Sequence, residues 1–164
     1  MSTLVLLGGP TGIGKSTTLN LLDNRLPKLA LLDADEVWRI SEDLAVEGTR
    51  RIAISNIVHV LKGYLDAGCD TAILSWVFAR SALYEPVITA LKDDFDAIHQ
   101  VYLVALPDVL EARLASRNSL DRLEYSISRL ELIEKLPYPK IDTTDLSPSE
   151  VVDKVLDHIR TLSM

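Results

Sequence analysis

The sequence reads Gly9-Pro10-Thr11-Gly12-Ile13-Gly14-Lys15-Ser16 between an aliphatic run and an amphipathic stretch. This is a complete G-x-x-x-x-G-K-S pattern, which arises by chance in roughly 0.5% of chains of this length at average residue usage. The aliphatic run Leu4–Leu7 predicts a buried strand, and Lys15–Leu26 predicts a helix. A strand, a glycine-rich turn and a helix in this order predict a loop that binds phosphate.

The residue types in this loop are those that a polyanion needs. Glycine lets the backbone curl so that successive N–H groups point at one anion, and the beginning of a helix adds partial positive charge. We expect Lys15 to reach the β- and γ-phosphates, the Ser16 hydroxyl to ligate Mg²⁺, and Thr17 to contact an α-phosphate oxygen. A turn without a ligand would leave a buried lysine beside unpaired amides, which is costly. The sequence therefore predicts ATP and Mg²⁺ as cofactors.

Further apolar runs alternate with amphipathic stretches along the chain. The runs predict strands at Leu29–Leu32, Thr71–Leu74, Val101–Ala105 and, briefly, around Ile141. The amphipathic stretches predict helices over Arg51–Ala67, Pro86–Leu91, Asp108–Arg117, Leu120–Leu136 and from Pro148 onward, with Pro86 in the first turn of its helix. Because continuous apolarity is typical of strands covered on both faces, this order indicates an α/β fold with a parallel sheet.

Composition narrows the class of protein. The chain has 164 residues, 48% apolar and 25% charged, which is ordinary globular usage and fits a single domain over residues 1–164. Its net charge of −7 argues against binding to nucleic acid or to a membrane surface. Cys69 is the one cysteine, which excludes an internal disulfide, and no apolar run is long enough to span a membrane. Without a basic leader, the expected location is the cytoplasm.

Two carboxylates, Asp33 and Asp35, follow the second predicted strand. Ligands of open α/β sheets bind at the carboxyl ends of the strands, and phosphoryl transfer needs a carboxylate that orients or deprotonates the acceptor hydroxyl. Either carboxylate could instead cap the helix that follows. The position after the phosphate loop favours a functional role, more strongly for Asp35 than for Asp33.

The chain resembles the small P-loop kinases that phosphorylate metabolites, nucleosides or antibiotics, such as gluconate kinase and chloramphenicol phosphotransferase. The resemblance rests on Gly9–Thr17, on Asp33-x-Asp35 and on an arginine-containing lid at about residues 113–126. It implies a five-stranded parallel sheet in the order 2-3-1-4-5, flanked by helices. It also implies that Asp35 faces the acceptor and that Asp33 lies nearer magnesium. The Gly-Gly-Gly segment typical of shikimate kinase is missing, which excludes that identity.

The end of the third predicted strand departs from the pattern of many P-loop proteins. Those proteins carry an acid there, whereas this chain has Ser75. Magnesium would then be held by Ser16, phosphate oxygens and water, with Asp33 in the outer shell. Ser16 and Asp33 are therefore the predicted metal residues.

Three arginines are the main candidates for the site, and Arg122 and Arg129 follow them along the chain as weaker ones. Arg113 and Arg117 lie four residues apart, on one face of a predicted helix, and Arg80 follows the third strand. The resemblance implies that lid arginines stack on adenine and neutralise the transferring phosphoryl group. We expect Arg113 to bind the nucleotide, Arg117 to act in catalysis and Arg80 to bind the acceptor together with Asp33 and Asp35. The alternative for each arginine is a surface ion pair.

Two other segments allow two interpretations each. The aromatic and apolar residues Trp38, Trp76, Val77 and Phe78 could wall an acceptor pocket or simply belong to the core. The turn at residues 142–144 resembles the loop that borders adenine in these kinases, or is an ordinary Asp/Thr turn.

These expectations describe an ATP-dependent phosphotransferase with the catalytic residues Lys15, Asp35 and Arg117. Its partner is a small-molecule acceptor such as a nucleoside, sugar or antibiotic, and the chain is expected to be a monomer or homodimer. A first rival is an NTPase or nucleotide-binding regulator without an acceptor, which the missing third-strand acid keeps open. A nucleic-acid-end kinase needs a basic channel, which scattered arginines in an acidic chain do not indicate.

Overall fold

A computed structural model of the chain describes residues 1–40 and 46–162. Its centre is a parallel five-stranded sheet in the order β2-β3-β1-β4-β5. The strands are β1 (Thr3–Gly8), β2 (Leu29–Asp33), β3 (Thr71–Ser75), β4 (Ala97–Val104) and β5 (Lys140–Asp142). The five predicted strands and their order are confirmed. Because the strands are parallel, their carboxyl ends meet at one edge of the sheet.

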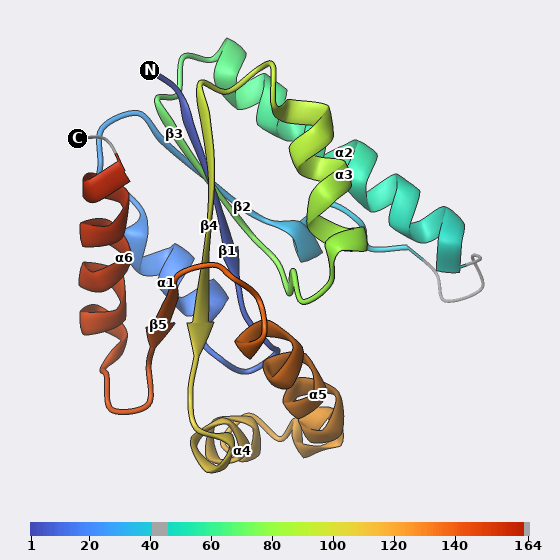
Figure 1. Cartoon of the computed structure of the whole chain (residues 1–164), viewed down its shortest axis with the longest axis vertical. Coiled ribbons are helices and arrows are strands. Elements are labelled where there is room, and N and C mark those ends of the chain that lie inside the picture. The colour runs from blue at the N-terminus through green and yellow to red at the C-terminus, as the bar shows by residue number, and fades with distance from the viewer. Residues whose placement is uncertain (41–45, 163–164) are drawn as a thin grey trace.

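Helices cover both faces of this sheet (Figure 1). One face carries α2 (Val46–Asp66) and α3 (Ser81–Leu91), and the other carries α1 (Lys15–Leu22) and α6 (Pro148–Leu162). At the carboxyl end of the strands, in the lower part of the view, lie α4 (Pro107–Ala115) and α5 (Leu123–Glu134). Two 3₁₀ turns, η1 (Ala34–Glu36) and η2 (Leu120–Arg122), complete the elements. None of the described helices is both long and apolar enough to cross a membrane.

The side chains of β1 point alternately to the two faces of the sheet, and the apolar ones on each face are covered by helices. Leu4 and Leu6 belong to the core on the side of α2 and α3, whereas Val5 and Leu7 belong to the core on the side of α1 and α6. All four side chains are fully buried. Since successive side chains of a strand point to opposite faces, a run without polar residues requires a layer of helices on each side.

The prediction for Pro86 is wrong. The helix α3 begins at Ser81, so Pro86 lies inside it rather than in its first turn. Proline has no N–H, which leaves the carbonyl of Ala82 without its helical donor. Ala82 is exposed, so water can bind that carbonyl instead, and this makes the proline tolerable.

Several predicted helix boundaries also differ from the structure. The first helix ends at Leu22 because the chain turns at Asn24, whose φ is 59°. The helix α2 begins at Val46, before the predicted start. The stretch predicted as one helix over residues 120–136 is divided into η2 and α5. Helix ends depend on local turns, which the apolar period does not report.

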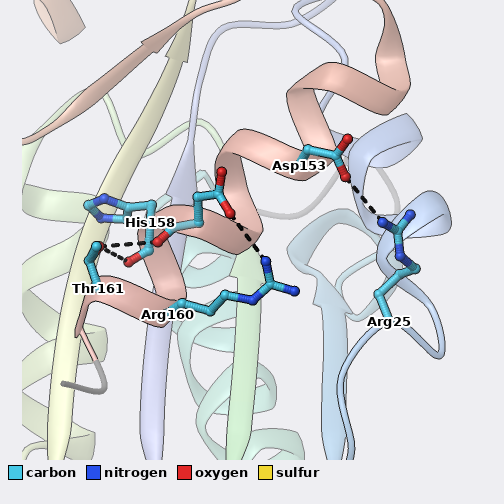
Figure 2. A network of polar contacts seen from close by, with 6 residues as sticks. Arg25, Asp153, His158, Arg160 and Thr161 are labelled. Carbon is cyan, nitrogen blue, oxygen red and sulfur yellow. Dashed lines mark hydrogen bonds and ion pairs between the residues drawn. The ribbon is translucent and has the colours of Figure 1, made fainter.

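The last helix is anchored as its sequence predicts. A capping box closes its beginning: Ser147 donates its amide to Glu150 Oε2 (2.8 Å), and the Glu150 amide donates to Ser147 Oγ (3.4 Å). Farther along, Arg25 pairs with Asp153 at 3.1 Å, and Arg160 pairs with Asp157 at 3.2 Å (Figure 2). Both ion pairs are exposed and contribute little, so the buried apolar stripe of α6 holds it on the sheet.

Candidate nucleotide and acceptor site

The phosphate loop connects the end of β1 to the beginning of α1. Gly14 precedes the helix with a φ of 111°, and Gly12 has a φ of 83°, in the region that favours glycine. A Cβ on Gly12 would lie 2.7 Å from Leu114 Cδ2, so this glycine also lets the loop approach α4. Within the described residues, the amides of Gly12, Gly14 and Lys15 donate to no other backbone group. These unpaired donors at a helix beginning suit an anion.

Lys15 folds back over the same loop. Its ammonium donates to the carbonyls of Gly9 (2.9 Å) and Pro10 (3.0 Å). Burial lowers the pKa of Lys15 from 10.5 to about 8, and the negative charges of Asp35 and Asp33 act in the opposite direction. The ammonium therefore lies close to both carboxylates and lacks full hydration, so a polyanion in the loop would stabilise its charge.

The pKa of Lys15 predicts proton uptake on nucleotide binding. Near pH 8 the free protein holds Lys15 partly neutral, whereas the triphosphate favours the ammonium form. Binding at about pH 9 should take up close to one proton, and above pH 8 the affinity should fall by up to about tenfold per pH unit. Calorimetry in buffers of different ionisation enthalpy measures this uptake. Equal heats in all buffers at about pH 9 would contradict the prediction.

Asp33 makes two contacts with its two oxygens. Oδ2 accepts a hydrogen bond from Ser16 Oγ at 2.7 Å, and Oδ1 accepts one from the Asp35 amide at 3.1 Å. The second contact caps η1, which is the structural alternative that the sequence left open. The first contact brings Asp33 next to the loop serine, so the oxygen that does not cap η1 lies at the phosphate loop. Ser16 and Asp33 are oxygen donors of the type that Mg²⁺ prefers.

Ser75 ends β3 beside Asp33, its partner in the strand register. The serine is fully buried, and its hydroxyl has no hydrogen-bond partner within the described part of the chain. A buried hydroxyl without a partner costs on the order of 1–3 kcal/mol. Its place at the carboxyl edge of the sheet favours a polar partner supplied by the bound state, such as a water of the magnesium shell.

Replacement of Ser75 by alanine should separate the cost of its unpaired hydroxyl in the free protein from a contribution of that hydroxyl to magnesium binding. Without ligand, the free energy of unfolding should stay the same or rise by about 1 kcal/mol, because an unpaired buried hydroxyl is removed. The Mg²⁺ concentration needed for nucleotide binding should increase, as measured by titration of the metal. The matched control is Ser126→Ala in α5, which also removes a buried unpaired hydroxyl. An unchanged magnesium requirement in Ser75→Ala would contradict the proposed water contact.

The lid arginines contact the loop from α4 and the residues after it. Arg113 donates to the carbonyl of Ile13 (3.3 Å) and to Oγ1 and the carbonyl of Thr143 (2.8 and 2.7 Å). Arg117 donates to Thr17 Oγ1 at 3.4 Å. Arg113 thus ties the phosphate loop to the turn at residues 142–144, and its guanidinium is occupied by these contacts.

A cavity of about 250 Å³ lies between the phosphate loop, the lid and the beginning of α6. Its lining includes Gly14, Thr17, Arg117 and Pro148. Thr143, which Arg113 holds, lies in the turn that leads into α6. The turn at residues 142–144 also fixes itself, since Asp142 accepts from the amide and hydroxyl of Thr144 at 2.9 and 2.6 Å. The position of this cavity beside the loop suits the nucleoside part of a nucleotide whose phosphates would occupy the loop.

A second cavity, of about 740 Å³, is lined in part by Asp35, and we call it the acceptor cavity. Its lining includes Asp35, Trp38, Trp76, Val77, Arg80 and Leu83. Trp38 donates its ring N–H to Asp35 Oδ1 at 3.3 Å and meets Trp76 edge to face, with ring centroids 6.0 Å apart. Asp35 and Arg80 thus lie on one cavity, whereas Asp33, the third residue predicted to bind the acceptor, lines a separate cavity with Ser16 and Asp35. Phe78 instead belongs to the core, where it is fully buried.

Three residues that line the acceptor cavity escaped the sequence analysis: Arg39, Arg50 and Tyr125. Arg129, one of the weaker arginine candidates, also lines it and lies over the Tyr125 ring, 4.3 Å from its centroid. They come from three separate segments, so no spacing in the sequence relates them. The repeated pairing of aromatic and arginine residues in these segments was the available signal, and it is a weak one.

The loop after β3 is held in a strained form. Phe78 has a φ of 42°, which is uncommon for a residue with a side chain. The buried hydroxyl of Tyr102 contacts the Phe78 carbonyl (3.1 Å) and Gln100 Oε1 (2.8 Å). Burial raises the pKa of Tyr102, so this hydroxyl stays a donor. This turn lies between Trp76 and Arg80, which both line the acceptor cavity.

Comparisons with known proteins agree with this geometry. No protein-family profile matches the chain, and no curated protein does. It is similar to the solved structure of a tunicamycin resistance protein from Deinococcus radiodurans, with a TM-score of 0.75 and 20% identity over 97% of this chain and 96% of that one. A gluconokinase from Sinorhizobium meliloti aligns with a TM-score of 0.73 and 14% identity, over 98% and 93%. Thymidylate kinase from Candida albicans aligns with a TM-score of 0.62 and 14% identity, over 99% and 92%.

The strand order, the phosphate loop and these likenesses define a class: the chain has the fold of the small P-loop kinases. The resemblance inferred from the sequence is confirmed at the level of the fold. Identities of this size establish architecture, whereas chemistry has to be argued from the site.

Proposed function

We propose that the chain is an ATP- and Mg²⁺-dependent kinase that transfers the γ-phosphoryl group to a hydroxyl of a small molecule. The observation that carries this proposal is the position of Asp35. Its charge acts on Lys15 of the phosphate loop, and the same side chain lines the acceptor cavity. A carboxylate between a phosphate site and a second cavity is what transfer requires and what simple nucleotide binding does not.

The residues present fit a magnesium–nucleotide complex. Unpaired amides at the beginning of α1, the Lys15 ammonium and the oxygens of Ser16 and Asp33 are donors for phosphate and metal. When bound, the complex supplies the transferable phosphoryl group and the metal charge that offsets its oxygens. Within the described residues, no cluster of three or more acidic, histidine or cysteine side chains forms a metal site. The fit thus depends on phosphate oxygens as further ligands.

Each side chain then has a separate task. Lys15 offsets the charge of the phosphates, and Ser16, held by Asp33, orients toward the metal. Asp35 orients the acceptor hydroxyl and takes its proton as the hydroxyl oxygen bonds to phosphorus, while the bond from phosphorus to the departing diphosphate breaks. Arg117 contributes charge from the lid, and Arg113 keeps the loop and the lid together. Little covalent chemistry is needed, so positioning and charge supply most of the rate.

The deciding experiment measures ADP formation with ATP, Mg²⁺ and a panel of nucleosides, sugars and hydroxylated antibiotics. Binding partners are first selected by thermal shift with a non-hydrolysable ATP analogue, since ligands of the folded state raise its melting temperature. Turnover that depends on one acceptor class, with the label of the γ-phosphate recovered on that acceptor, supports the kinase. Turnover that is independent of every acceptor supports the rival NTPase.

A further inference from the structure

The acceptor cavity concentrates positive charge in an acidic protein. The chain has a net charge of −7, yet four arginines, Arg39, Arg50, Arg80 and Arg129, line this one cavity. They come from the segment after η1, from α2, from the β3–α3 loop and from α5. Among the described residues that line it, Asp35 is the only carboxylate. Convergence of four separate segments on one cavity is unlike a random surface distribution of charge.

Three of these guanidinium groups have no ion-pair partner among the described side chains. Within residues 1–40 and 48–162, Arg39, Arg50 and Arg80 have no carboxylate at ion-pair distance. Arg129 lies over the Tyr125 ring, an arrangement that orients a guanidinium without removing its charge. Like charges gathered around a cavity repel one another and attract an anion into it.

The phosphate loop does not account for this charge. The lining of the acceptor cavity contains none of the residues Gly9–Thr17, which belong to the triphosphate side. Arg113 and Arg117 supply the positive charge on that side, where they contact the loop itself. Arg50, Arg80 and Arg129 are therefore available to the second substrate, whereas Arg39 also lines a cavity beside Ser16 and Asp33.

Much of the remaining wall of the cavity is aromatic or aliphatic. Trp38 and Trp76 meet at an interplanar angle of 69°, and Val77 and Leu83 extend the apolar surface. Trp76 is 7% exposed and is fixed on its other side by Phe78, with ring centroids 5.9 Å apart. A rigid aromatic wall of this kind favours a ring or another flat apolar body over an open-chain polyol.

We propose that the phosphoryl acceptor is a ring-bearing hydroxyl compound that also carries a negatively charged group, a carboxylate or a phosphate. This inference rests on the proposed function. The ring lies against Trp38 and Trp76, and the anion pairs with the arginines, Arg80 and Arg129 among them. Because Asp35 repels an anion, the hydroxyl rather than the charged group is directed to that carboxylate. Arginine suits the task since its planar fork binds carboxylate and phosphate in bidentate fashion.

The two tryptophans provide a direct measurement. They are the only two in the sequence, and both line the acceptor cavity, so intrinsic tryptophan fluorescence reports on this cavity. The probes are para-benzenedimethanol, para-(hydroxymethyl)benzoate and para-(hydroxymethyl)phenyl phosphate, which share a ring and a hydroxyl and differ in charge. Titrations contain no nucleotide. At least one anion should bind at least about tenfold more tightly than the neutral diol, as expected for a charge-assisted pair. The tighter of the two anions identifies the charged group.

Single variants test the assignment to the arginines. Arg80→Gln and Arg129→Gln lie on different segments, and each should reduce the preference for the anion severalfold, while affinity for the diol is retained. Arg160→Gln is the matched control, because it removes an exposed arginine of α6, a helix that contributes no residue to the described lining of the cavity. Thermal melting shows which variants fold. One folded variant of the two is enough to test the assignment. A preference that is unchanged in the folded variants overturns the proposal.

Two further outcomes overturn it in the wild-type protein: equal affinity for the diol and both anions, or no fluorescence change with any probe. Binding of the ATP analogue is measured on the same samples. A chain that prefers the anions but binds no nucleotide refutes the proposed kinase and leaves the anion site standing. A chain that transfers phosphoryl groups to neutral acceptors and ignores the anions refutes this inference alone.

Discussion

Replacement of Lys15 by alanine should weaken ATP binding by at least about 30-fold and abolish phosphoryl transfer. The ammonium is the one lysine charge within the phosphate loop, and hydrogen bonds to charged groups contribute about 1.5–3 kcal/mol each. Its effect on transfer should be larger than on binding, since charge develops on the phosphoryl oxygens during the reaction. Calorimetry measures the affinity, and ADP formation measures the transfer.

The control for this variant is Lys154→Ala, which removes an exposed lysine of α6. It should bind ATP as the wild-type protein does. In the free Lys15→Ala protein the fold should persist, because the change removes a charge that burial already disfavours. Melting curves test this. A folded Lys15→Ala protein that binds ATP with wild-type affinity would remove the basis of the nucleotide site.

Replacement of Asp35 by asparagine should lower turnover by about 10²–10⁴-fold, the range that a general base contributes. Affinity for ATP should change little, because the phosphates are held by the loop and not by Asp35. The variant is nearly isosteric, and its amide oxygen can still accept the hydrogen bond from the Trp38 ring N–H. The acceptor cavity should therefore keep its shape. Steady-state rates with the acceptor found by screening, together with calorimetric titration of ATP, measure the two effects.

Asp157→Asn is the matched control for the loss of a carboxylate, since Asp157 lies on α6 and pairs with Arg160 at the surface (Figure 2). It should retain wild-type turnover. Full activity of Asp35→Asn would show that another group orients the acceptor. Equal losses of turnover and of ATP affinity would instead indicate that Asp35 supports the phosphate loop through its effect on Lys15.

The nucleotide side of the site was the part most readily predicted from the sequence. Gly12, Gly14, Lys15 and Ser16 are consecutive or nearly so, and a local backbone conformation with free amides is sufficient to present them together. The strands could be predicted for a related reason. Runs such as Leu4–Leu7 have no polar face, so they can only be covered on both sides.

Helix ends were harder to predict because they depend on single turns. Pro86 is typical of a helix beginning, but α3 starts five residues earlier. The helix tolerates the proline because Ala82, whose carbonyl is left without a helical donor, is exposed to solvent. The hydrogen-bond partners of Asp33 were likewise open. Only the structure assigns one oxygen to Ser16 and the other to the Asp35 amide.

The sequence by itself determined the phosphate loop, the parallel sheet and the place of Asp35 at a strand end, because each follows from local pattern and from the solvation of apolar residues. The tertiary structure alone decided the character of the acceptor cavity. Arg39, Arg50, Arg80 and Arg129 are separated by up to 90 positions in the printed sequence, and folding of β2, α2, β3 and α5 around one sheet edge brings them together. Charge that is dispersed along a chain becomes a site only when long-range packing concentrates it, and no local period records that event.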